Sequence, residues 1–330
     1  MIRPLSIPVF DVSQVGQVRR AATRMADEAG LPEVKRGEVA IVATELATNL
    51  ARYGRDGRVI LQVSTEPGMG LEVVTIDSGP GMADVQKCLQ DGFSTGGTPG
   101  NGLGAVRRLA AEFDLYSLPG KGTVVFARVA AAAPSATPGA FRWAAISTPA
   151  PHEELCGDAW RVAVRDREIA VMVVDGLGHG PEAAKAADLA VRLFEQQWFD
   201  GPAAFCENAH RALSGSRGAA IAAAHVSPAG VVRYAGVGNI SAYVVNPEAS
   251  RGMLSQNGTA GLQMRKVQQF DYPWPDRALL VMHSDGLSNR WALDDYHGLI
   301  TRHPAVVAGV LHRDFLRGRD DATIVVMRAA

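Results

Sequence analysis

A glutamate and an asparagine, Glu45 and Asn49, stand four residues apart in an apolar-periodic segment that ends at Gly54. The apolar positions recur at steps of three and four, the helical period: Val39, Val42, Leu46 and Leu50. On a helix, the carboxylate and the carboxamide share one face. This pair suits a hard cation such as Mg²⁺, or a nucleophile that must lose a proton. A solvated helix face is the alternative. Gly54 is expected to end the helix, as a residue that tolerates a positive φ does after a last turn.

A second candidate site is the stretch Asp77-Ser-Gly-Pro-Gly-Met82, which follows a strand expected over 71–76. Asp77 could accept a hydrogen bond from an exocyclic amine such as that of adenine. Gly79 and Gly81 would let a planar base approach the backbone. A tight turn closed by an aspartate side chain is the alternative.

A glycine-rich stretch over 93–104 then leads into a helix expected over 105–111. Such a loop offers free N–H groups to phosphates at a helix N-terminus, and it could close as a lid over a nucleotide. A disordered loop is the alternative.

These three motifs occur in the order ELATN, DSGPGM and GNGLG, over about residues 8–130. In this order they resemble the GHKL ATPase fold, especially the small serine kinases of the anti-sigma type and the RsbT-like switch kinases of stress signalling. The resemblance implies that Asn49 holds Mg²⁺, that Glu45 is the general base and that Asp77 binds the adenine amino group. It also implies that glycines line the nucleotide: Gly79 and Gly81 beside the base, and Gly102 and Gly104 at the triphosphate. No phospho-acceptor histidine motif is present, so the sequence does not predict a histidine kinase.

Four aspartates stand at the ends of apolar strands in the second half of the chain: Asp158, Asp175, Asp285 and Asp320. One Asp-Gly pair usually marks only a turn. Several carboxylates at one sheet edge repel one another unless a divalent cation neutralises them. Oxygen ligands favour Mg²⁺ or Mn²⁺ over zinc, and two such ions can activate water for displacement at phosphorus.

The motifs GDAW, VVDGLGHG, GVGNI, MHSDG and DDAT, over about residues 140–330, resemble the SpoIIE and RsbX branch of the metal-dependent serine/threonine phosphatases, which are protein phosphatase 2C-like. The resemblance implies that the four aspartates are metal ligands and that Gly176 adds its backbone carbonyl. Asp321 is the weaker candidate ligand. Gly238 and Asn239 are interpreted as a turn between strands.

Three further features have a structural and a functional interpretation. His179 could protonate a leaving serine oxygen, but a loop residue is favoured because lone histidines often have no catalytic role. Cys156 is interpreted as a small buried residue rather than a thiolate ligand. His152, Glu153 and Glu154 are interpreted as the solvated start of a strand rather than a metal cluster.

The elements that must position these residues fall into two groups. Strands over 58–64, 71–76, 113–118 and 123–129, with helices over 11–29 and around Glu45, build the first group. In the second, helices over 181–198 and 202–213 interrupt seven short strands: 141–146, 160–164, 169–174, 219–226, 231–235, 240–245 and 278–284. A last strand follows Asp320. An Ala/Pro/Ser-rich segment between the groups is typical of a linker.

The predicted fold is therefore α+β. The resemblances imply a GHKL α/β sandwich (Bergerat ATP-binding fold) over 1–130, followed by a linker over 131–140 and an αββα sandwich of the protein phosphatase 2C type over 141–330.

Composition agrees with two globular domains in 330 residues, 47% of them hydrophobic. A net charge of −1 gives no electrostatic reason to expect nucleic acid or a membrane surface as partner. Three scattered cysteines indicate no disulfide framework and fit a cytoplasmic location. No segment approaches membrane-spanning length.

The sequence thus predicts a bifunctional partner-switching regulator. The first domain would use Mg-ATP to phosphorylate a serine or threonine, and the second would remove such phosphates with one or two Mn²⁺ or Mg²⁺ ions and metal-activated water. Resemblance implies a STAS-domain anti-sigma antagonist or a stressosome-type phosphoprotein as partner, in a pathway that could control a sigma factor. One alternative is a phosphatase whose GHKL domain only senses ATP or binds an anti-sigma partner. Another is a scaffold with two degenerate catalytic domains.

Overall fold

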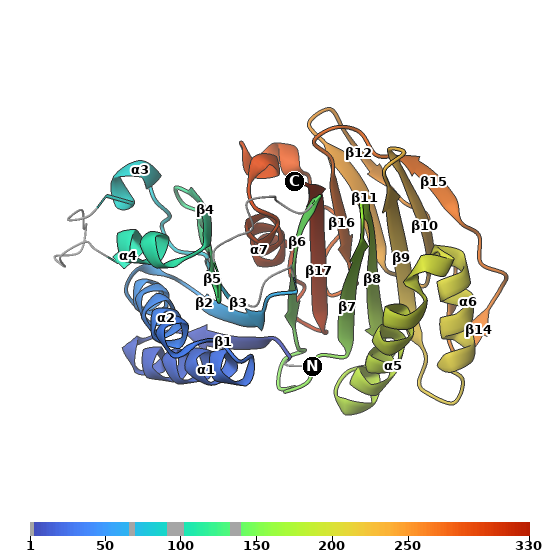
Figure 1. Ribbon diagram of the computed structural model, residues 1–330, viewed down its shortest axis with the longest axis horizontal. Coiled ribbons are helices and arrows are strands. Elements are labelled where there is room, and N and C mark those ends of the chain that lie inside the picture. Colours follow the sequence, from blue (N-terminus) through green and yellow to red (C-terminus); the bar gives the residue numbers. More distant parts are fainter. Residues whose placement is uncertain (1–2, 66–69, 91–101, 133–139) are drawn as a thin grey trace. The chain divides into compact units, whose positions relative to one another are not determined.

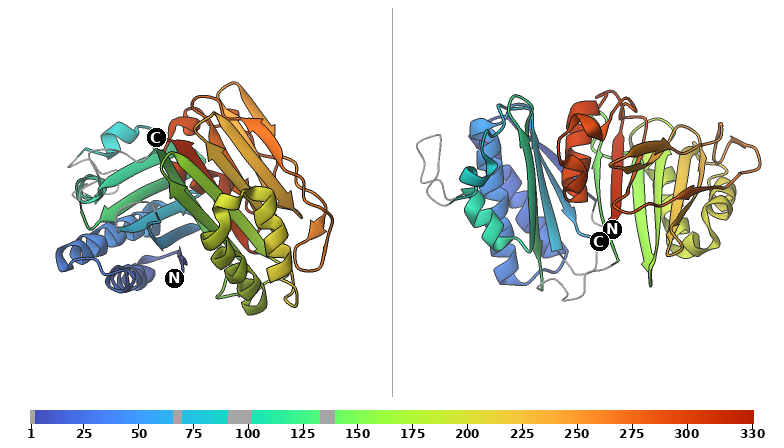
Figure 2. Two further views of the ribbon diagram at one scale, coloured as in Figure 1. Left: turned by 45° about the vertical axis from the view of Figure 1, so that its right-hand side comes forward. Right: turned by 90° about the horizontal axis from the view of Figure 1, so that it is seen from above.

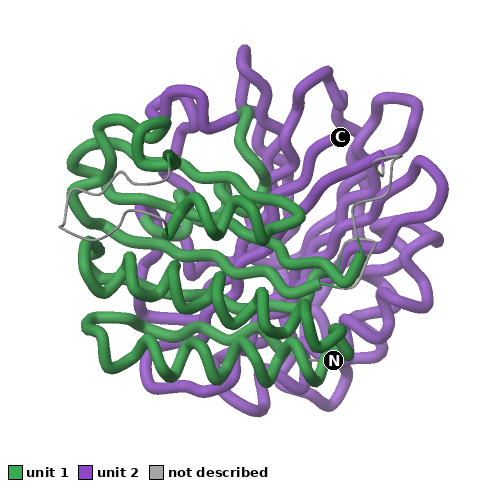
Figure 3. Tube along the Cα trace, turned by 60° about the vertical axis from the view of Figure 1, so that its left-hand side comes forward, with its two compact units in different colours: residues 1–139, 301–313 green, residues 140–300, 314–330 purple. Residues whose placement is uncertain are grey.

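A computed structural model describes residues 3–65, 70–90, 102–132 and 140–330. The chain divides into two compact units: residues 1–139 with 301–313, and residues 140–300 with 314–330 (Figure 3). Unit 1 therefore takes in Thr301–Arg313, a segment that the sequence analysis assigned to the second domain. Seven of the ten residues of the expected linker, 133–139, lie outside the described residues.

Unit 1 contains a five-stranded antiparallel sheet in the order β1-β2-β3-β5-β4 (Figure 1). Its strands are Leu5–Val9 (β1), Gly57–Val63 (β2), Gly70–Asp77 (β3), Glu112–Leu118 (β4) and Gly122–Ala130 (β5). Sequence alternation predicted β2 to β5 to within two residues. Strand β1 was not predicted, since it is short and contains Pro8, and it pairs at the sheet edge with β2 alone.

Two helices of unit 1 pack on one face of this sheet. They are α1 (Val15–Glu28) and α2 (Glu33–Tyr53). Their apolar stripes join the inward-facing strand residues in one core, in which Val18, Leu46 and Val73 are fully or almost fully buried. The helix expected over 11–29 is divided into a 3-10 turn, η1 (Val12–Gln14), and α1. Asp11 caps the turn by accepting the Ser13 N–H at 2.7 Å.

Helix α7 (Pro304–Phe315) was not predicted from the sequence. Its residues up to Arg313 are grouped with unit 1, where His303 just before the helix stacks on Phe126 at 4.1 Å between ring centroids. Gly309 approaches β5 so closely that a Cβ there would lie 2.6 Å from Val124. Residues 304–312 are all buried, so the segment lacks the amphipathic period that reveals a surface helix.

Unit 2 is built on two five-stranded sheets, in the orders β15-β10-β9-β8-β7 and β12-β11-β16-β17-β6. The strands of the first sheet are Asp158–Arg165 (β7), Glu168–Gly176 (β8), Ala219–Ser227 (β9), Val231–Val237 (β10) and Phe270–Pro273 (β15). Those of the second sheet are Phe141–Thr148 (β6), Ser241–Asn246 (β11), Ala249–Gly252 (β12), Leu279–His283 (β16) and Ala322–Ala329 (β17). A small hairpin joins Gly258–Thr259 (β13) to Gln263–Met264 (β14).

Side chains from both sheets of unit 2 form one core, including Trp143, Tyr234 and Met282. Helices α5 (Pro181–Gln197) and α6 (Pro202–Ala212) cover the outer face of the β8-containing sheet (Figure 2), and Phe194 and Phe205 pack against it. This is the β-sandwich with flanking helices that the strand spacing predicted.

Short elements complete the two units: α3 (Val85–Cys88), α4 (Gly102–Leu109), and the 3-10 turns η2 (Trp198–Asp200), η3 (Leu293–Asp295) and η4 (Leu299–Thr301). Within the described ranges, none of the helices combines the length and apolar character needed to cross a bilayer.

Candidate active sites

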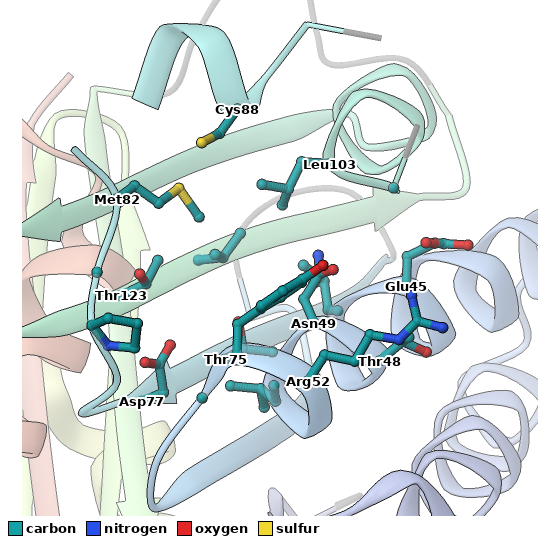
Figure 4. A pocket seen from close by; sticks show the side chains of 18 of the residues that line it. Glu45, Thr48, Asn49, Arg52, Thr75, Asp77, Met82, Cys88, Leu103 and Thr123 are labelled. Carbon is teal, nitrogen blue, oxygen red and sulfur yellow. The ribbon is translucent and has the colours of Figure 1, made fainter. Parts of the chain in front are cut away.

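A cavity of about 930 Å³ opens between α2, α4 and the strands β3 and β5 of unit 1. Glu45, Thr48, Asn49 and Arg52 line it from successive turns of α2, and Asp77 lines it from the end of β3 (Figure 4). The volume is at the upper end of the range typical of small-molecule sites, which leaves room for a nucleotide. Glu45, Asn49 and Asp77 therefore share one cavity, although Asp77 follows Glu45 by 32 positions in the sequence.

Glu45 lies directly against the start of α4. A Cβ on Gly102 would come within 2.7 Å of Glu45 Oε2, so a side chain larger than hydrogen would displace the carboxylate. Gly102 also lines the cavity, whereas Gly104 is buried and is absent from its described lining. Residues 91–101, most of the predicted phosphate-binding loop, lie outside the described residues.

Asp77 forms the expected turn at the end of β3, because its Oδ1 accepts the Gly79 N–H at 2.7 Å. Burial raises the pKa of Asp77, while the Gly79 N–H and the charge of Arg313 act in the opposite direction. The turn and a nucleotide-binding role are compatible, since a carboxylate has more than one acceptor site.

The glycines of this motif also have a structural role within the protein. A Cβ on Gly79 would lie 2.6 Å from the Tyr53 carbonyl, and one on Gly81 would lie 2.1 Å from the Leu118 carbonyl. Gly81 lines the cavity and also has a positive φ of 70°, while Gly79 does not appear in the described lining. Both glycines are therefore required by close approach of the protein's own backbone.

Gly54 ends α2 as predicted, but not with a positive φ. Its φ is −78°, and its N–H donates to Leu50 O at 2.8 Å. A Cβ at this position would meet Leu50 O at 2.7 Å and the Asp77 Cβ at 3.3 Å. The glycine is therefore needed for space, where the end of the helix meets the Asp77 turn, rather than for a left-handed conformation.

In unit 2, strand pairing brings the candidate ligands to one end of the sandwich. Asp158 begins β7 and stands opposite Asp175 at the end of β8. Asp285 follows β16, and Asp320 precedes β17, which pairs with β16. The two pairs, which are more than a hundred positions apart in the sequence, lie close together, since Ser284 bonds to Asp158 and the charge of Asp285 acts on Asp175.

The glycines that follow two of these aspartates permit the close packing. A Cβ on Gly286 would lie 2.0 Å from the Asp321 carbonyl, and one on Gly176 would lie 2.3 Å from the Ala183 carbonyl. The first contact brings the start of β17 against the end of β16. The second seats the first turn of α5 against the end of β8.

Ser284 holds Asp158 in place, a role that the sequence analysis missed. Its hydroxyl donates to Asp158 Oδ2 at 2.6 Å and accepts the Thr323 N–H at 2.9 Å, and Ser284 is fully buried. The other carboxylate oxygen, Asp158 Oδ1, is buried and makes no hydrogen bond. The sequence shows only a serine directly before Asp285, which does not reveal this role because the partner Asp158 lies 126 positions away.

The electrostatics of the cluster oppose its full ionisation. Burial, together with repulsion from Asp321 and Asp320, raises the pKa of Asp158 to about 8 although the Ser284 hydroxyl lowers it. Burial and then repulsion from the neighbouring aspartates raise the pKa of Asp175 to about 9. These shifts are the ones expected of carboxylates that share a site without a cation.

Two neighbouring residues make hydrogen bonds that the sequence analysis did not predict. Asn239, interpreted as part of a turn, donates from Nδ2 to Asp285 Oδ2 at 2.6 Å and so orients a candidate ligand. Asp321 accepts the Ala150 and Gly157 N–H groups, each at 2.8 Å, one on each carboxylate oxygen. Asp321 thus has a structural role in holding the loop before β7, which agrees with its position as the weaker candidate ligand.

The other candidates occupy the same neighbourhood. Burial raises the pKa of the Cys156 thiol well above its usual value, and Cys156 donates to Thr148 O at 3.5 Å, as suits a buried thiol. His179 Nδ1 lies 2.6 Å from Glu153 Oε1. Glu153 lies in the loop before β7, not at the start of a strand, since β7 begins at Asp158.

A divalent cation fits the chemistry of these donors. An unpartnered buried oxygen on Asp158 and several crowded carboxylates are what a hard cation would satisfy. In the described part of the chain, no three His, Cys, Asp or Glu side chains already converge closely enough to form a finished metal site.

Comparison with known families finds a separate match in each half of the chain. Residues 9–129 match the family model described as "Histidine kinase-like ATPase domain". Residues 165–330 match the model described as "Stage II sporulation protein E (SpoIIE)". Asp175, Asp285 and Asp320 lie inside the second match, and Asp158 lies just before it.

Individual relatives support both assignments. "Serine/threonine-protein kinase RsbT" of Bacillus subtilis (strain 168) is 38% identical over 108 residues, which are 32% of this chain and 81% of that protein. A solved structure described as "The bacterial stressosome: a modular system that has been adapted to control secondary messenger signaling" aligns with a TM-score of 0.52 at 27% identity, over 57% of this chain and 99% of that one.

The crystal structure of RsbX "in complex with magnesium" aligns with a TM-score of 0.50 at 18% identity. The alignment covers 59% of this chain and 98% of the RsbX chain, and it shows a similar fold.

Proposed function

Because this chain belongs to the family of stage II sporulation protein E (SpoIIE) and also carries a histidine kinase-like ATPase domain, we propose that it is a bifunctional partner-switching regulator. A kinase-like domain over 1–130 phosphorylates a serine or threonine of a partner. A phosphatase domain over 141–330, joined by a linker over 131–140, removes phosphate from such residues.

In the kinase-like domain, each cavity residue has a defined task. Asp77 accepts a hydrogen bond from the adenine amino group, and Asn49 would hold the Mg²⁺ that accompanies ATP. Glu45 takes the proton from the hydroxyl group of the acceptor serine or threonine. The oxygen of that hydroxyl bonds to the γ-phosphorus of ATP, and ADP leaves. Gly102 leaves the space in which the Glu45 carboxylate sits.

In the phosphatase domain, Asp158, Asp175, Asp285 and Asp320 would hold one or two Mn²⁺ or Mg²⁺ ions, with the Gly176 carbonyl. Such ions, when bound, supply activated water and neutralise the phosphate. Ser284 and Asn239 fix the orientation of two of these carboxylates through hydrogen bonds. Outer-shell contacts of this kind hold ligands in the geometry that binds metal.

A STAS-domain anti-sigma antagonist or a stressosome-type phosphoprotein is the proposed partner. The similarity to RsbT and to a stressosome structure supports this context. Opposed activities on one chain raise each other's effective concentration around a shared substrate. They also require regulation, since unregulated cycling would only consume ATP.

The single observation that carries the proposal is that one chain sets Glu45 and Asn49 in a nucleotide-sized cavity and also gathers four aspartates at neighbouring strand ends. To test the kinase half, Glu45→Ala is compared with the unmodified chain for ATP binding by calorimetry and for phosphate transfer. Retained binding with lost transfer supports a kinase. Binding without transfer in both proteins leaves the alternative, an ATP-sensing or anti-sigma-binding domain.

The phosphatase half is tested by titrating the chain with Mn²⁺ and measuring hydrolysis of a phosphoserine peptide. Asp175→Asn is expected to weaken Mn²⁺ binding and to abolish hydrolysis, because it removes a ligand charge. An unmodified chain that binds no Mn²⁺ would contradict the phosphatase assignment and favour a scaffold.

A further inference from the structure

Three loops of unit 2 meet beside the Asp175–Gly176 strand end. The β8–β9 pairing places Gly176 opposite Ala219, and just beyond it the Leu177 N–H donates to Gly218 O at 3.0 Å. The β13–β14 hairpin joins them through two hydrogen bonds between Ala219 and Ala260, at 3.0 and 2.9 Å. Backbone hydrogen bonds therefore hold these loops beside the candidate metal site, and Ser216 Oγ adds to them by accepting the Gly218 N–H at 3.0 Å.

Two leucines project from these loops into solvent. Leu177 is 50% exposed and Leu262 is 56% exposed. Both neighbour Gly218, to which the Leu177 N–H donates and where an added Cβ would lie 3.0 Å from Leu262 Cγ. Single exposed leucines are common, but two beside one candidate catalytic carboxylate form a rigid apolar surface that a substrate could cover.

Arg217 supplies a positive charge at the same place. Its Nη1 atom would lie 3.1 Å from a Cβ on Gly178, so the guanidinium extends along the loop that follows Asp175. Among the described residues, Arg217 has no ion-pair partner, although its charge helps to lower the pKa of Glu182 after the larger effect of Lys185. A phosphate dianion approaching crowded carboxylates needs such a cation, and arginine is suited to phosphate oxygens.

We propose that Leu177, Arg217 and Leu262 form the substrate-recognition surface of the phosphatase, and that it accepts a phosphoserine or phosphothreonine flanked by apolar side chains. Arg217 pairs with the phosphate, and the two leucines contact the neighbouring residues of the substrate protein. The charge complementarity and the continuity with the Asp175 strand end both favour this occupant. The inference rests on the proposed phosphatase function of the same site.

Steady-state hydrolysis by the full-length chain with Mn²⁺ tests this surface. Three substrates are compared: a phosphoserine peptide with leucine on both sides, the same peptide with glycine and serine neighbours, and p-nitrophenyl phosphate. The unmodified chain is expected to prefer the leucine-flanked peptide. The double variant Leu177→Ser/Leu262→Ser should reduce the kcat/KM ratio of that peptide to p-nitrophenyl phosphate about tenfold, since burial of two apolar side chains is lost.

Arg217→Ala is expected to raise KM about tenfold for all three substrates, because each carries a phosphate, while Arg217→Lys should restore part of the loss. Val164→Ser and Arg167→Ala are matched controls. Both residues are exposed and lie at the opposite end of the β7–β8 hairpin, so the selectivity ratio and KM should stay within about twofold.

Two results separate failure of this surface from failure of the proposed function. Equal use of both peptides by an active chain, or leucine variants that keep the selectivity ratio, would overturn the recognition surface alone. An unmodified chain that hydrolyses none of the three substrates would overturn the phosphatase function, and the inference with it.

Discussion

At the scale of single residues, Glu45 has little free space, because Gly102 leaves only a hydrogen atom beside its carboxylate. Gly102→Ala should displace Glu45 at small energetic cost, since the end of a flexible side chain can move. We expect phosphate transfer to fall on the order of a hundredfold and the melting temperature to change by less than about 2 °C. Both are measured on purified protein, transfer with labelled ATP and melting by circular dichroism. Transfer at the unmodified rate would show that Glu45 is not the base.

Ser284 offers a second test at this scale. Ser284→Ala removes the hydrogen bond to Asp158 and leaves the Thr323 N–H without its partner. Mn²⁺ affinity, measured by calorimetry, is expected to fall about tenfold or more, as for other outer-shell partners. Ser147→Ala is the control, because this buried hydroxyl contacts Thr323 and no candidate ligand. Equal affinity in both variants would remove Ser284 from the metal site.

The sequence allowed prediction of residues that stand out from their immediate neighbours. It did not allow prediction of residues whose role depends on a contact with a part of the chain far away in the sequence. The aspartates at strand ends could be recognised because an acidic residue interrupts an apolar run. Ser284 and Asn239 could not, since their partners lie 126 and 46 residues away in the chain. The placement of Gly102 against Glu45 likewise depends on how α4 packs on α2, which no local pattern encodes.

At the scale of elements, α2 carries one position that is suboptimal for a helix. Gly37 lies in its second turn, is exposed and has no atom within 4 Å of an added Cβ. Gly37→Ala should raise the free energy of unfolding by about 0.5–1 kcal/mol, because alanine loses less backbone entropy. Urea unfolding measures this change. Phosphate transfer should be unaffected, so the variant also serves as a control for Gly102→Ala, and a loss of stability would contradict the packing described for α2.

Periodicity predicted the strands that are half-buried and the helices that present one apolar face. It missed α7, whose residues 304–312 are buried on every side, and β1, which is short and contains a proline. Periodicity also predicted one helix in place of η1 and α1. Asp11 and Ser13 are both plausible N-caps, and the sequence does not show that the first turn is a 3-10 turn.

At the scale of the whole molecule, the contacts of α7 group most of this helix with unit 1, whereas its position in the sequence lies within the second half of the chain. The segment lies in the sequence between the phosphatase strands β16 and β17, yet residues up to Arg313 are grouped with unit 1. No sequence pattern could predict this grouping, since it depends on tertiary contacts alone. Thus the unit that contains the nucleotide-sized cavity also contains a segment of the phosphatase sequence.

His312 in α7 makes the stability of the protein depend on pH. Burial, with a smaller effect of Arg58, lowers the pKa of His312 to about 3, whereas an unfolded histidine titrates near 6.5. Between these values the unfolded chain binds the additional proton, so stability should fall as pH falls from about 6.5 towards 3. Urea unfolding midpoints at pH 7 and 4.5 measure the change, and His312→Gln should show a smaller decrease. An equal decrease in both proteins would show that His312 is solvated.

Phosphate labelling with Asp175→Asn tests the central claim, two opposed activities on one chain, most directly. In this variant the phosphatase cannot erase the product of the kinase. The variant is incubated with γ-labelled ATP, Mg²⁺ and a lysate of the host cell. We predict one labelled protein band that is absent with Asp175→Asn/Glu45→Ala and that the unmodified chain removes when Mn²⁺ is added. No band despite measurable ATP binding would contradict the kinase half, and a band that the unmodified chain leaves intact would contradict a shared substrate.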